Sequence, residues 1–185
     1  MALSDSLRLI GLLPDHVPEA DMMTLVDSLL STPIEAVAVE AATSNGVLML
    51  EILLEMRSDE IVIGGVSKGV ALPDGVDFEL YSHSQIEMSL FTLDEALEHI
   101  KAFVGYGGRN LFFNGSLDEA GTIRTLFPTL NFWRYGDFSP AEAQAWMADG
   151  HYGLVPLLWH RPEQNMTQTI SLGRAFRDIV MVDEN

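Results

Sequence analysis

Short apolar runs alternate with amphipathic stretches along most of the chain. Residues 7–13, 34–41 and 61–66 are apolar without strict polar alternation, which is typical of parallel strands covered on both faces. After the first run, apolar residues recur three or four positions apart from Met22 to Leu30, which is the spacing of one helix face. The pattern predicts an α/β fold in which strands are followed by helices.

Three helix starts are marked in the second half of the chain. Thr92, Ser116 and Ser139 are each followed three residues later by a glutamate, and in this capping box the two side chains satisfy amides that lack partners at a helix start. Further strands are predicted at residues 109–113, 130–135 and 153–159, and a closing helix at residues 170–180. The repeated strand-helix unit indicates a parallel sheet, either closed as a barrel or open.

Composition narrows the class of protein. The 185 residues fit one domain, residues 1–185. The net charge of −17 repels phosphate backbones and anionic lipid headgroups, so neither nucleic acid nor a membrane is expected as a partner. Cysteine is absent, which excludes disulfides and thiolate chemistry. The start of the chain lacks the features of a secretion signal, so a cytoplasmic protein is expected.

Several segments of the second half carry a family resemblance. They are residues 103–115 (FVGYGGRNLFFNG), residues 127–128 (FP), residues 132–136 (FWRYG) and residues 138–141 (FSPA). In order and spacing they resemble the 2-keto-3-deoxy-6-phosphogluconate/4-hydroxy-2-oxoglutarate (KDPG/KHG) aldolases. The resemblance implies a TIM-type (β/α)8 barrel, a homotrimer, and a small 2-keto acid or carboxylate as ligand. From strand pattern alone, an open parallel α/β sheet is the alternative.

The chain departs from the family at the positions that carry its chemistry. The resemblance places the Schiff-base lysine at Leu111, the acid/base glutamate at Ala38 and the substrate arginine at Ala41. Residues 134–137 (RYGD) and 156–158 (PLL) replace the glycine-rich ends that bind phosphate in the family. Loss of Schiff-base aldolase activity is therefore expected, and a phosphorylated substrate is disfavoured.

The middle of the predicted barrel, residues 67–91, is too short for the family's helices. Candidate strands at residues 78–81 and 86–91 are separated by four residues, whereas a parallel crossover needs about a dozen. We expect a remodelled barrel here, in which the two segments pair as a hairpin or loops replace the helices, with another subunit as a possible cover. The turn signal Pro73-Asp74-Gly75 favours a loop.

Two lysines are the candidates for a relocated nucleophile. A class I aldolase needs an amine whose pKa is lowered, so that the neutral form attacks a ketone. Lys101 falls within a predicted helix, where a solvated side chain is expected. Lys68 follows a strand end, on the barrel face where active sites lie. Its alternative role is that of an exposed loop lysine.

Four further residues are candidate site residues. Glu40 ends the second strand, either as a base or metal ligand at the barrel mouth or as a solvated carboxylate. Arg134 could bind a carboxylate in a fork or pair with Asp137. Asn114 and Ser67 could line a substrate pocket.

Histidine spacing predicts no metal site and no cofactor. None of the five histidines forms an HxH or HExxH pattern. A metal-dependent site would need loop histidines to converge with a carboxylate in space. The candidates for such a site are His16, His83 and His160 with Glu40 or Glu87.

Two functional hypotheses remain open. In the first, the chain is a diverged aldolase-like protein without Schiff-base catalysis that acts as a small-molecule binding or scaffold protein. In the second, it is an active carbon-carbon lyase that cleaves a small 2-keto acid, using Lys68, or Glu40 with a metal. The fold does not choose between them, because activity resides in the site.

Overall fold

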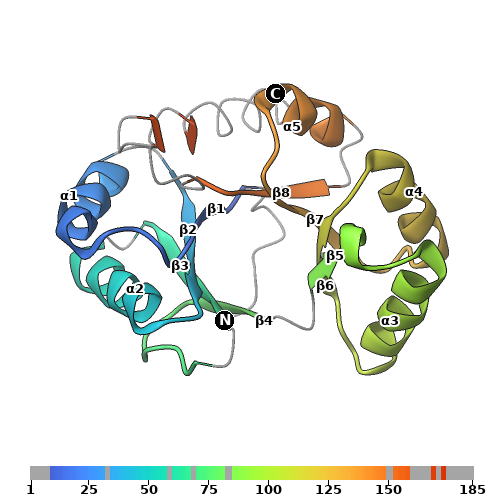
Figure 1. Ribbon diagram of the computed structural model, residues 1–185, viewed down its shortest axis with the longest axis horizontal. Helices are drawn as coiled ribbons and strands as arrows, with labels where there is room; N and C mark the ends of the chain where they lie inside the picture. The colour runs from blue at the N-terminus through green and yellow to red at the C-terminus, as the bar shows by residue number, and fades with distance from the viewer. Residues whose placement is uncertain are drawn as a thin grey trace.

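Eight parallel strands and five α-helices make up the described part of the chain (Figure 1). The computed structural model describes residues 9–31, 34–57, 60–67, 70–81, 85–148, 152–158, 168–169 and 172–173. In chain order the elements are β1 (Gly11–Leu13), α1 (Glu19–Leu30), β2 (Ala36–Ala41), α2 (Ser44–Met56), β3 (Val62–Ser67), β4 (Phe78–Tyr81), β5 (Gln85–Glu87), the 3-10 turn η2 (Met88–Leu90), α3 (Leu93–Gly105), β6 (Asn110–Asn114), α4 (Leu117–Leu126), β7 (Asn131–Gly136), α5 (Pro140–Met147) and β8 (Tyr152–Pro156). Most of the closing helix predicted at residues 170–180 lies outside the described residues.

The strands form two four-stranded sheets that join along β1 and β8. The order is β1-β2-β3-β4 in one sheet and β5-β6-β7-β8 in the other, and every pair is parallel. The Ile10 amide donates to the Leu154 carbonyl at 2.9 Å, and the Leu158 amide donates to the Leu12 carbonyl at 2.7 Å. Parallel strands in consecutive order are the arrangement of a barrel, whereas the order reverses in a doubly wound sheet. The fold is a TIM-type (β/α)8 barrel, as predicted.

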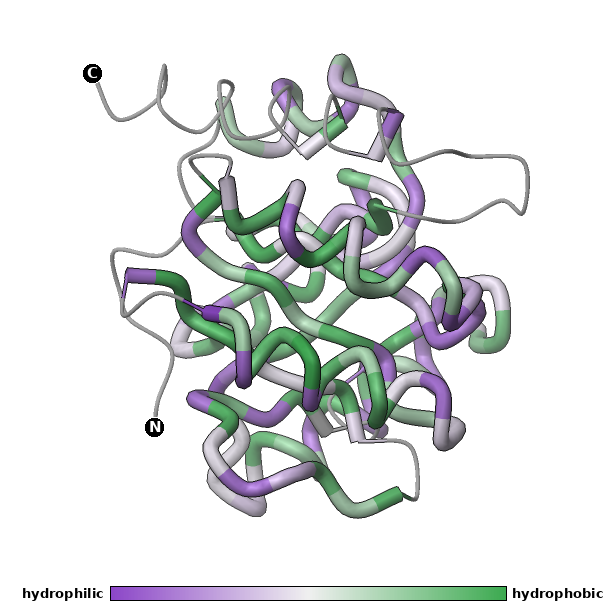
Figure 2. Tube along the Cα trace, turned by 90° about the vertical axis from the view of Figure 1, so that its left-hand side faces the viewer, coloured by the Kyte–Doolittle hydropathy of each residue, from purple (hydrophilic) through white to green (hydrophobic). Residues whose placement is uncertain are grey.

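Buried side chains form three clusters that separate the inside of the barrel from its outside. One contains no helix residue, and we call it the interior cluster: Ile10, Leu12, Ala36, Ala38, Val66, Phe78, Leu80, Phe112, Trp133 and Val155. The other two pack strand side chains against α1 and α2 on one side and against α3, α4 and α5 on the other. Figure 2 shows hydrophobic stretches through the middle of the molecule. The barrel is thus filled and covered by apolar side chains.

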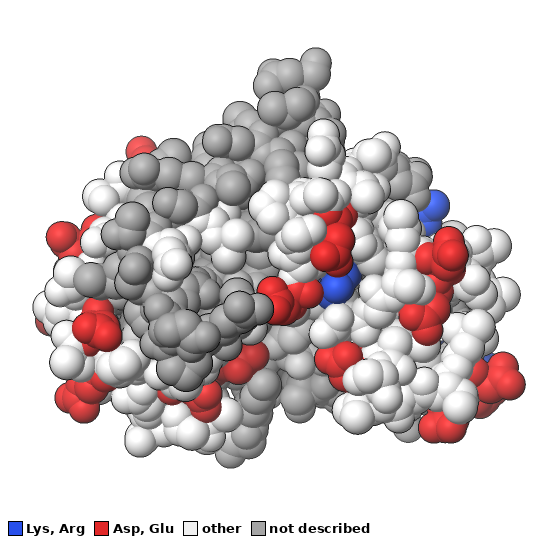
Figure 3. Space-filling view, turned by 45° about the horizontal axis from the view of Figure 1, so that its top comes forward, with Lys and Arg blue, Asp and Glu red and all other residues white. Residues whose placement is uncertain are grey.

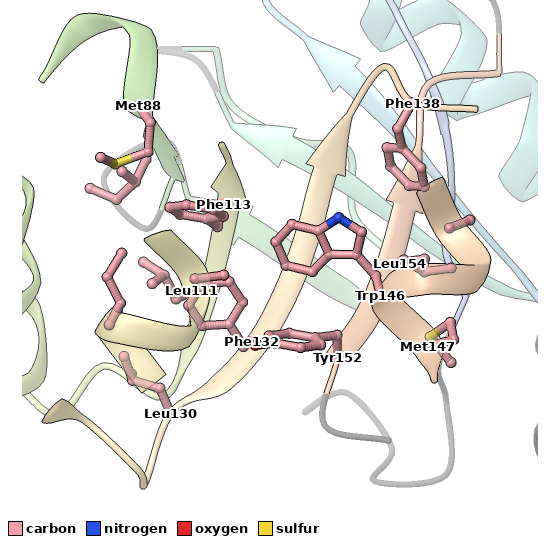
Figure 4. Packing of buried hydrophobic residues seen from close by; sticks show 14 of the residues in the cluster. Met88, Leu111, Phe113, Leu130, Phe132, Phe138, Trp146, Met147, Tyr152 and Leu154 are labelled. Atoms are coloured by element: carbon pink, nitrogen blue, oxygen red, sulfur yellow. The ribbon is translucent and has the colours of Figure 1, made fainter. Parts of the chain in front are cut away.

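Aromatic rings dominate the cluster beneath α3, α4 and α5 (Figure 4). The ring centroids of Trp146 and Tyr152 lie 4.8 Å apart in an edge-on arrangement. Those of Phe113 and Phe132 lie 5.0 Å apart. Tilted and edge-on pairs of this kind are the favoured aromatic geometries. They fix α5 and the neighbouring strands against one another.

The predicted helix starts are confirmed. Ser116 and Ser139 form complete capping boxes with glutamates three residues later. The Glu119 amide donates to Ser116 Oγ at 3.1 Å, and the Ser116 amide donates to Glu119 Oε1 at 2.9 Å. The side chain of Thr92 likewise accepts from the Glu95 amide. These caps set where the chain turns from each strand into its helix.

Residues 67–91 differ from the expected hairpin. The segment 78–81 pairs with β3, and the segment 85–87 pairs with β6, so the hairpin alternative is wrong. The strand predicted at residues 86–91 is also shorter than expected, because residues 88–90 form η2. Residues 82–84 between the two strands lie outside the described part of the chain.

A loop, and no helix, occupies the described residues 70–77 between β3 and β4. Asp77 anchors it, since its Oδ2 accepts from the Ile63 amide at 2.9 Å and from Arg57 Nη1 at 2.5 Å. The Asp77 amide donates back to the Ile63 carbonyl at 2.7 Å. In β4, Glu79 points away from the interior cluster and is exposed, so this outward position of the strand is polar.

Candidate functional site

Four polar side chains lie at or next to the carboxyl ends of β2, β5, β6 and β7: Glu40, Glu87, Asn114 and Tyr135. Gln85 begins the short strand β5, two positions before Glu87, and we call these five side chains the mouth residues. All five are half-buried. In (β/α)8 barrels this end of the strands carries the active sites. The mouth residues are therefore the candidate functional site.

Strand alternation directs these side chains toward the barrel interior. In β2, β6 and β7 the residue two positions before the mouth residue belongs to the interior cluster, and Tyr135 itself packs against that cluster. In β5, Ile86 packs in the outer cluster beneath the helices. Because successive side chains of a strand point to opposite faces, Gln85 and Glu87 point inward.

A hydrogen bond across the barrel joins two of the mouth residues. The Tyr135 hydroxyl donates to Glu40 Oε1 at 2.9 Å. Burial raises the pKa of Tyr135 above its ordinary value, and the negative charge of Glu40 and the hydrogen bond to it raise that pKa further. The charge of Glu87 acts in the same direction. Tyr135 is thus a neutral hydrogen-bond donor to the Glu40 carboxylate.

A second set of hydrogen bonds runs along the ends of β5, β6 and β7. Arg134 Nη1 donates to Asn114 Oδ1 at 2.9 Å, and Asn114 Nδ2 donates to Glu87 Oε2 at 2.8 Å. The Ser89 hydroxyl donates to the other oxygen of Glu87 at 3.1 Å. Both oxygens of the Glu87 carboxylate are thereby fixed in position.

Arg134 supports these hydrogen bonds from the helix side of the sheet. It is only 5% exposed. The guanidinium lies 4.9 Å from the ring centroid of Phe138 and 5.6 Å from that of Trp146, which are in the outer cluster (Figure 4). Nη1 also donates to the Tyr135 carbonyl. Burial lowers the pKa of Arg134, while the carboxylates of Glu142, Glu87 and Asp137 oppose that shift.

Two carboxylates bring negative charge to the described part of the mouth. The charges of Glu40 and Glu87 both raise the pKa of Tyr135. Among the described contacts, Arg134 is the cation that is hydrogen-bonded to a mouth residue, Asn114. Figure 3 shows one face of the molecule on which acidic side chains far outnumber basic ones. An anionic ligand placed beside these two carboxylates would be repelled by them.

The structure brings together three of the residues that the sequence singled out. Asn114 and Arg134 are hydrogen-bonded, and Glu40 lies at the same end of the barrel, bonded to Tyr135. Ser67 ends β3 but follows the interior residue Val66, so alternation turns its side chain away from the mouth. Their roles in binding or catalysis stay predictions.

Of the two candidate lysines, the structure describes only Lys101. Lys68 is outside the described residues, so its placement is not assigned. Lys101 lies within α3 and is exposed, as its helical position predicts. The described strands contain no lysine.

Leu111, at the position that the resemblance gives to the Schiff-base lysine, faces the helices and not the barrel interior. Leu111 is fully buried and packs in the outer cluster beneath the helices. Its neighbour Phe112 faces the barrel interior. A nucleophile inside the ring of strands would therefore need a position of β6 that alternates with Leu111, such as that of Phe112.

Sequence reasoning did not assign Tyr135 or Gln85 to the site. The available signal is the alternation itself, since each is a polar residue on the inward face of its strand. Tyr135 stands two positions after the interior residue Trp133, and Gln85 stands opposite the interior residue Phe112 in the register of β5 and β6.

The described residues contain no group of three or more histidine, cysteine or carboxylate residues placed to hold a metal ion. Of the proposed histidine ligands, His83 and His160 lie outside the described part. No helix among the described residues is long and apolar enough to cross a membrane.

Comparison with known proteins rests on structure alone. No protein-family model matches the sequence, and no curated protein matches it either. A structure described as native KDPGal superposes with a TM-score of 0.70 at 14% identity, covering 100% of this chain and 99% of that one.

Two further solved structures of aldolases also superpose on this chain. The 2-keto-3-deoxy-6-phospho-gluconate aldolase from Zymomonas mobilis gives a TM-score of 0.68 at 14% identity, with 91% of each chain covered. A 4-hydroxy-2-oxoglutarate/KDPG aldolase from TTHB1 gives 0.62 at 16% identity, with 94% of each chain covered. The chain thus has the (β/α)8 fold of the KDPG/KHG aldolases, to which its sequence is only distantly similar.

Proposed function

We propose that this aldolase-like protein binds a small molecule at the mouth residues and lacks Schiff-base aldolase activity. The observation that carries the proposal is the identity of the inward-facing side chains. The described strands present apolar residues, carboxylates, amides and a tyrosine to the interior, and no lysine. Without an amine on the described strands, a ketone has no group on them with which to form an imine.

The preorganised polar groups support a binding role. Glu87 has both oxygens hydrogen-bonded, and the donor Asn114 is itself held by the buried Arg134. Groups fixed in this way lose little conformational freedom when a ligand binds. The aldolase resemblance supports the view that the ligand is a small molecule, with a 2-keto acid or another carboxylate as the family's class.

Borohydride trapping tests the proposal. The protein is incubated with pyruvate, reduced with borohydride and weighed by intact mass spectrometry, beside a lysine-dependent KDPG aldolase as the positive control. We expect an adduct on the control and none on this protein. A stoichiometric adduct that disappears in a Lys68→Met variant would contradict the proposal.

The second candidate is an active lyase with Lys68 as its amine. The observation in its favour is that β3 ends at Ser67, so Lys68 directly follows a strand end of the kind that carries barrel active sites. The trapping experiment separates this candidate from the first. A Lys101→Met variant is the matched control, because Lys101 is exposed on α3.

A metal-dependent lyase built on Glu40 is tested separately. Cleavage of a 2-keto acid that requires an added divalent ion, and that a chelator abolishes, would support it. Loss of this cleavage in Glu40→Gln would assign the ligand.

A homotrimer is the assembly that the resemblance supports. Several large apolar side chains are exposed in the monomer, among them Leu90 and Leu126 at 74% and 56%, and an interface would bury such surface. Light scattering measures the mass in solution. A monomer at the concentration used for binding would contradict this assembly.

A further inference from the structure

We propose that Arg134 is a positioning residue of the candidate site, which acts through Asn114 to fix the direction of the Glu87 carboxylate at the barrel mouth. This inference rests on the proposed binding function and names the residues that hold one of its hydrogen-bond acceptors in place. Its basis is a series of hydrogen bonds among described residues, together with the glycine that leaves room for them.

The two partners of Asn114 give its amide a single orientation. Arg134 Nη1 donates to Asn114 Oδ1 at 2.9 Å, and a guanidinium has no acceptor. Asn114 Nδ2 donates to Glu87 Oε2 at 2.8 Å, and an ionised carboxylate has no donor. Turning the amide over would place two donors together at Arg134 and two acceptors together at Glu87. Asn114 therefore transmits the position of Arg134 to Glu87.

Arg134 is the fixed end of this series of hydrogen bonds. Its guanidinium lies 4.9 Å from the ring centroid of Phe138 and 5.6 Å from that of Trp146, distances at which a cation is attracted to an aromatic ring. Nη1 also donates to the Tyr135 carbonyl. A group held by two rings and a backbone carbonyl restricts Asn114 more than a solvated side chain would.

Gly136 leaves the room that the Asn114 amide occupies. It ends β7 and has a φ of 110°, in the region that favours glycine. A Cβ at this position would lie 2.9 Å from Asn114 Nδ2 and 3.8 Å from Arg134 Nη1. A side chain here would therefore press the amide away from Glu87. The glycine is a second feature of the chain that fits the same arrangement.

The arrangement is compatible with a ligand at Glu87. The Ser89 hydroxyl donates to Oε1 of Glu87 at 3.1 Å, and Asn114 donates to the other oxygen. Each carboxylate oxygen has about two lone-pair sites, so a ligand O–H or N–H can bind without displacing Asn114 or Ser89. Because the direction of the carboxylate is set beforehand, less conformational freedom is lost on binding.

Exchange of the Asn114 side-chain amide with solvent tests the positioning role. It is measured by NMR on isotope-labelled full-length protein, for the parent and for Arg134→Met. We expect exchange at least about tenfold faster in the variant, which corresponds to about 1.4 kcal/mol, because Asn114 loses the group that holds it against Glu87. The Asn131 amide is the internal control, since its Nδ2 donates to Asn110 Oδ1, and its exchange should change little.

Asp77→Ala is the matched control variant. Asp77 binds the Ile63 amide near the start of β3, at the opposite end of the strands from the mouth, so its loss weakens the fold without touching Asn114. Exchange at Asn114 should stay as in the parent.

A second variant serves if Arg134→Met does not fold. Asn114→Ala removes the link to Glu87 and leaves the aromatic contacts of Arg134 in place. The NMR signal of the Glu87 carboxylate carbon should move in Asn114→Ala and stay at its parent position in Asp77→Ala.

The outcomes separate this inference from the function on which it rests. Parent-like exchange at Asn114 in a folded Arg134→Met would show that Arg134 only packs, and would overturn the inference. An unmoved Glu87 signal in Asn114→Ala would overturn it too, as would equal changes in Asp77→Ala. None of these measurements needs a ligand, so a borohydride adduct with pyruvate would overturn the proposed function and leave the positioning role standing.

Discussion

The Tyr135 hydroxyl donates a 2.9 Å hydrogen bond to Glu40 Oε1 and so links β7 to β2 across the barrel. These strands are not neighbours in the sheet, because β8 and β1 lie between them. The bond is therefore a contact across the interior at the end where the mouth residues gather. It connects the half of the barrel that carries Glu87 and Asn114 to the half that carries Glu40.

Tyr135→Phe is expected to lower the free energy of unfolding by about 1 kcal/mol, the usual net value of one hydrogen bond. Chemical denaturation measures it. A double-mutant cycle with Glu40→Gln isolates the pair, and a coupling energy near zero would show that the bond contributes nothing.

The same pair predicts a dependence on alkaline pH. The folded state raises the pKa of Tyr135, so above about pH 10, the ordinary value, the unfolded chain loses a proton that the folded chain keeps. Stability from this group is therefore complete below about pH 10 and is lost as the pH rises. The melting temperature of the parent should fall more steeply than that of Tyr135→Phe above this pH. Parallel curves would contradict the prediction, since the other tyrosines are common to both proteins.

Arg134→Met is expected to destabilise the protein by about 2 kcal/mol, because it removes the buried donor to the Asn114 side chain and the Tyr135 carbonyl. Arg134→Lys should not restore the loss, since an ammonium lacks the planar group that stacks on Phe138 and Trp146. Urea unfolding gives both values. Arg109→Met is the control, because Arg109 is exposed, and an equal effect there would refute the assignment.

Much of the fold could be predicted because its signals are local. The capping boxes at Ser116 and Ser139 and the apolar strands before them depend on residues a few positions apart. Such patterns can be recognised without knowing how the rest of the chain folds. Closure into a barrel depended on the family resemblance, because strand-helix alternation alone also fits an open sheet.

The candidate site was less accessible to sequence reasoning. Glu40 and Tyr135 are brought together by the curvature of the sheet, and 95 residues separate them in the chain. The face on which a strand residue lies is also decided by register, and a shift of one position exchanges inside and outside. This is why Leu111, the match to the aldolase lysine, proves to face the helices while Phe112 faces the interior.

Asp77→Ala is expected to cost about 2 kcal/mol, because the Asp77 carboxylate holds both the Ile63 amide and Arg57 where a loop replaces a helix. Arg57→Ala should cost less, below about 1 kcal/mol, since it removes only a partly exposed ion pair. Denaturation midpoints of the two variants measure the difference. Equal costs would mean that the bond to the Ile63 amide is not important for stability.

Gly64→Ala tests how tightly the barrel interior is filled. A Cβ at Gly64 would lie 2.3 Å from the ring of Phe78, so the ring must move, and overpacking of this kind costs about 1–3 kcal/mol. Gly121→Ala is the matched control, because nothing lies within 4 Å of the added atom in α4, and the helix should gain about 0.5–1 kcal/mol. In a Phe78→Leu background the cost of Gly64→Ala should shrink, since the clashing ring is gone. A cost that is unchanged in that background would place the strain elsewhere and contradict the packing of Phe78 over Gly64.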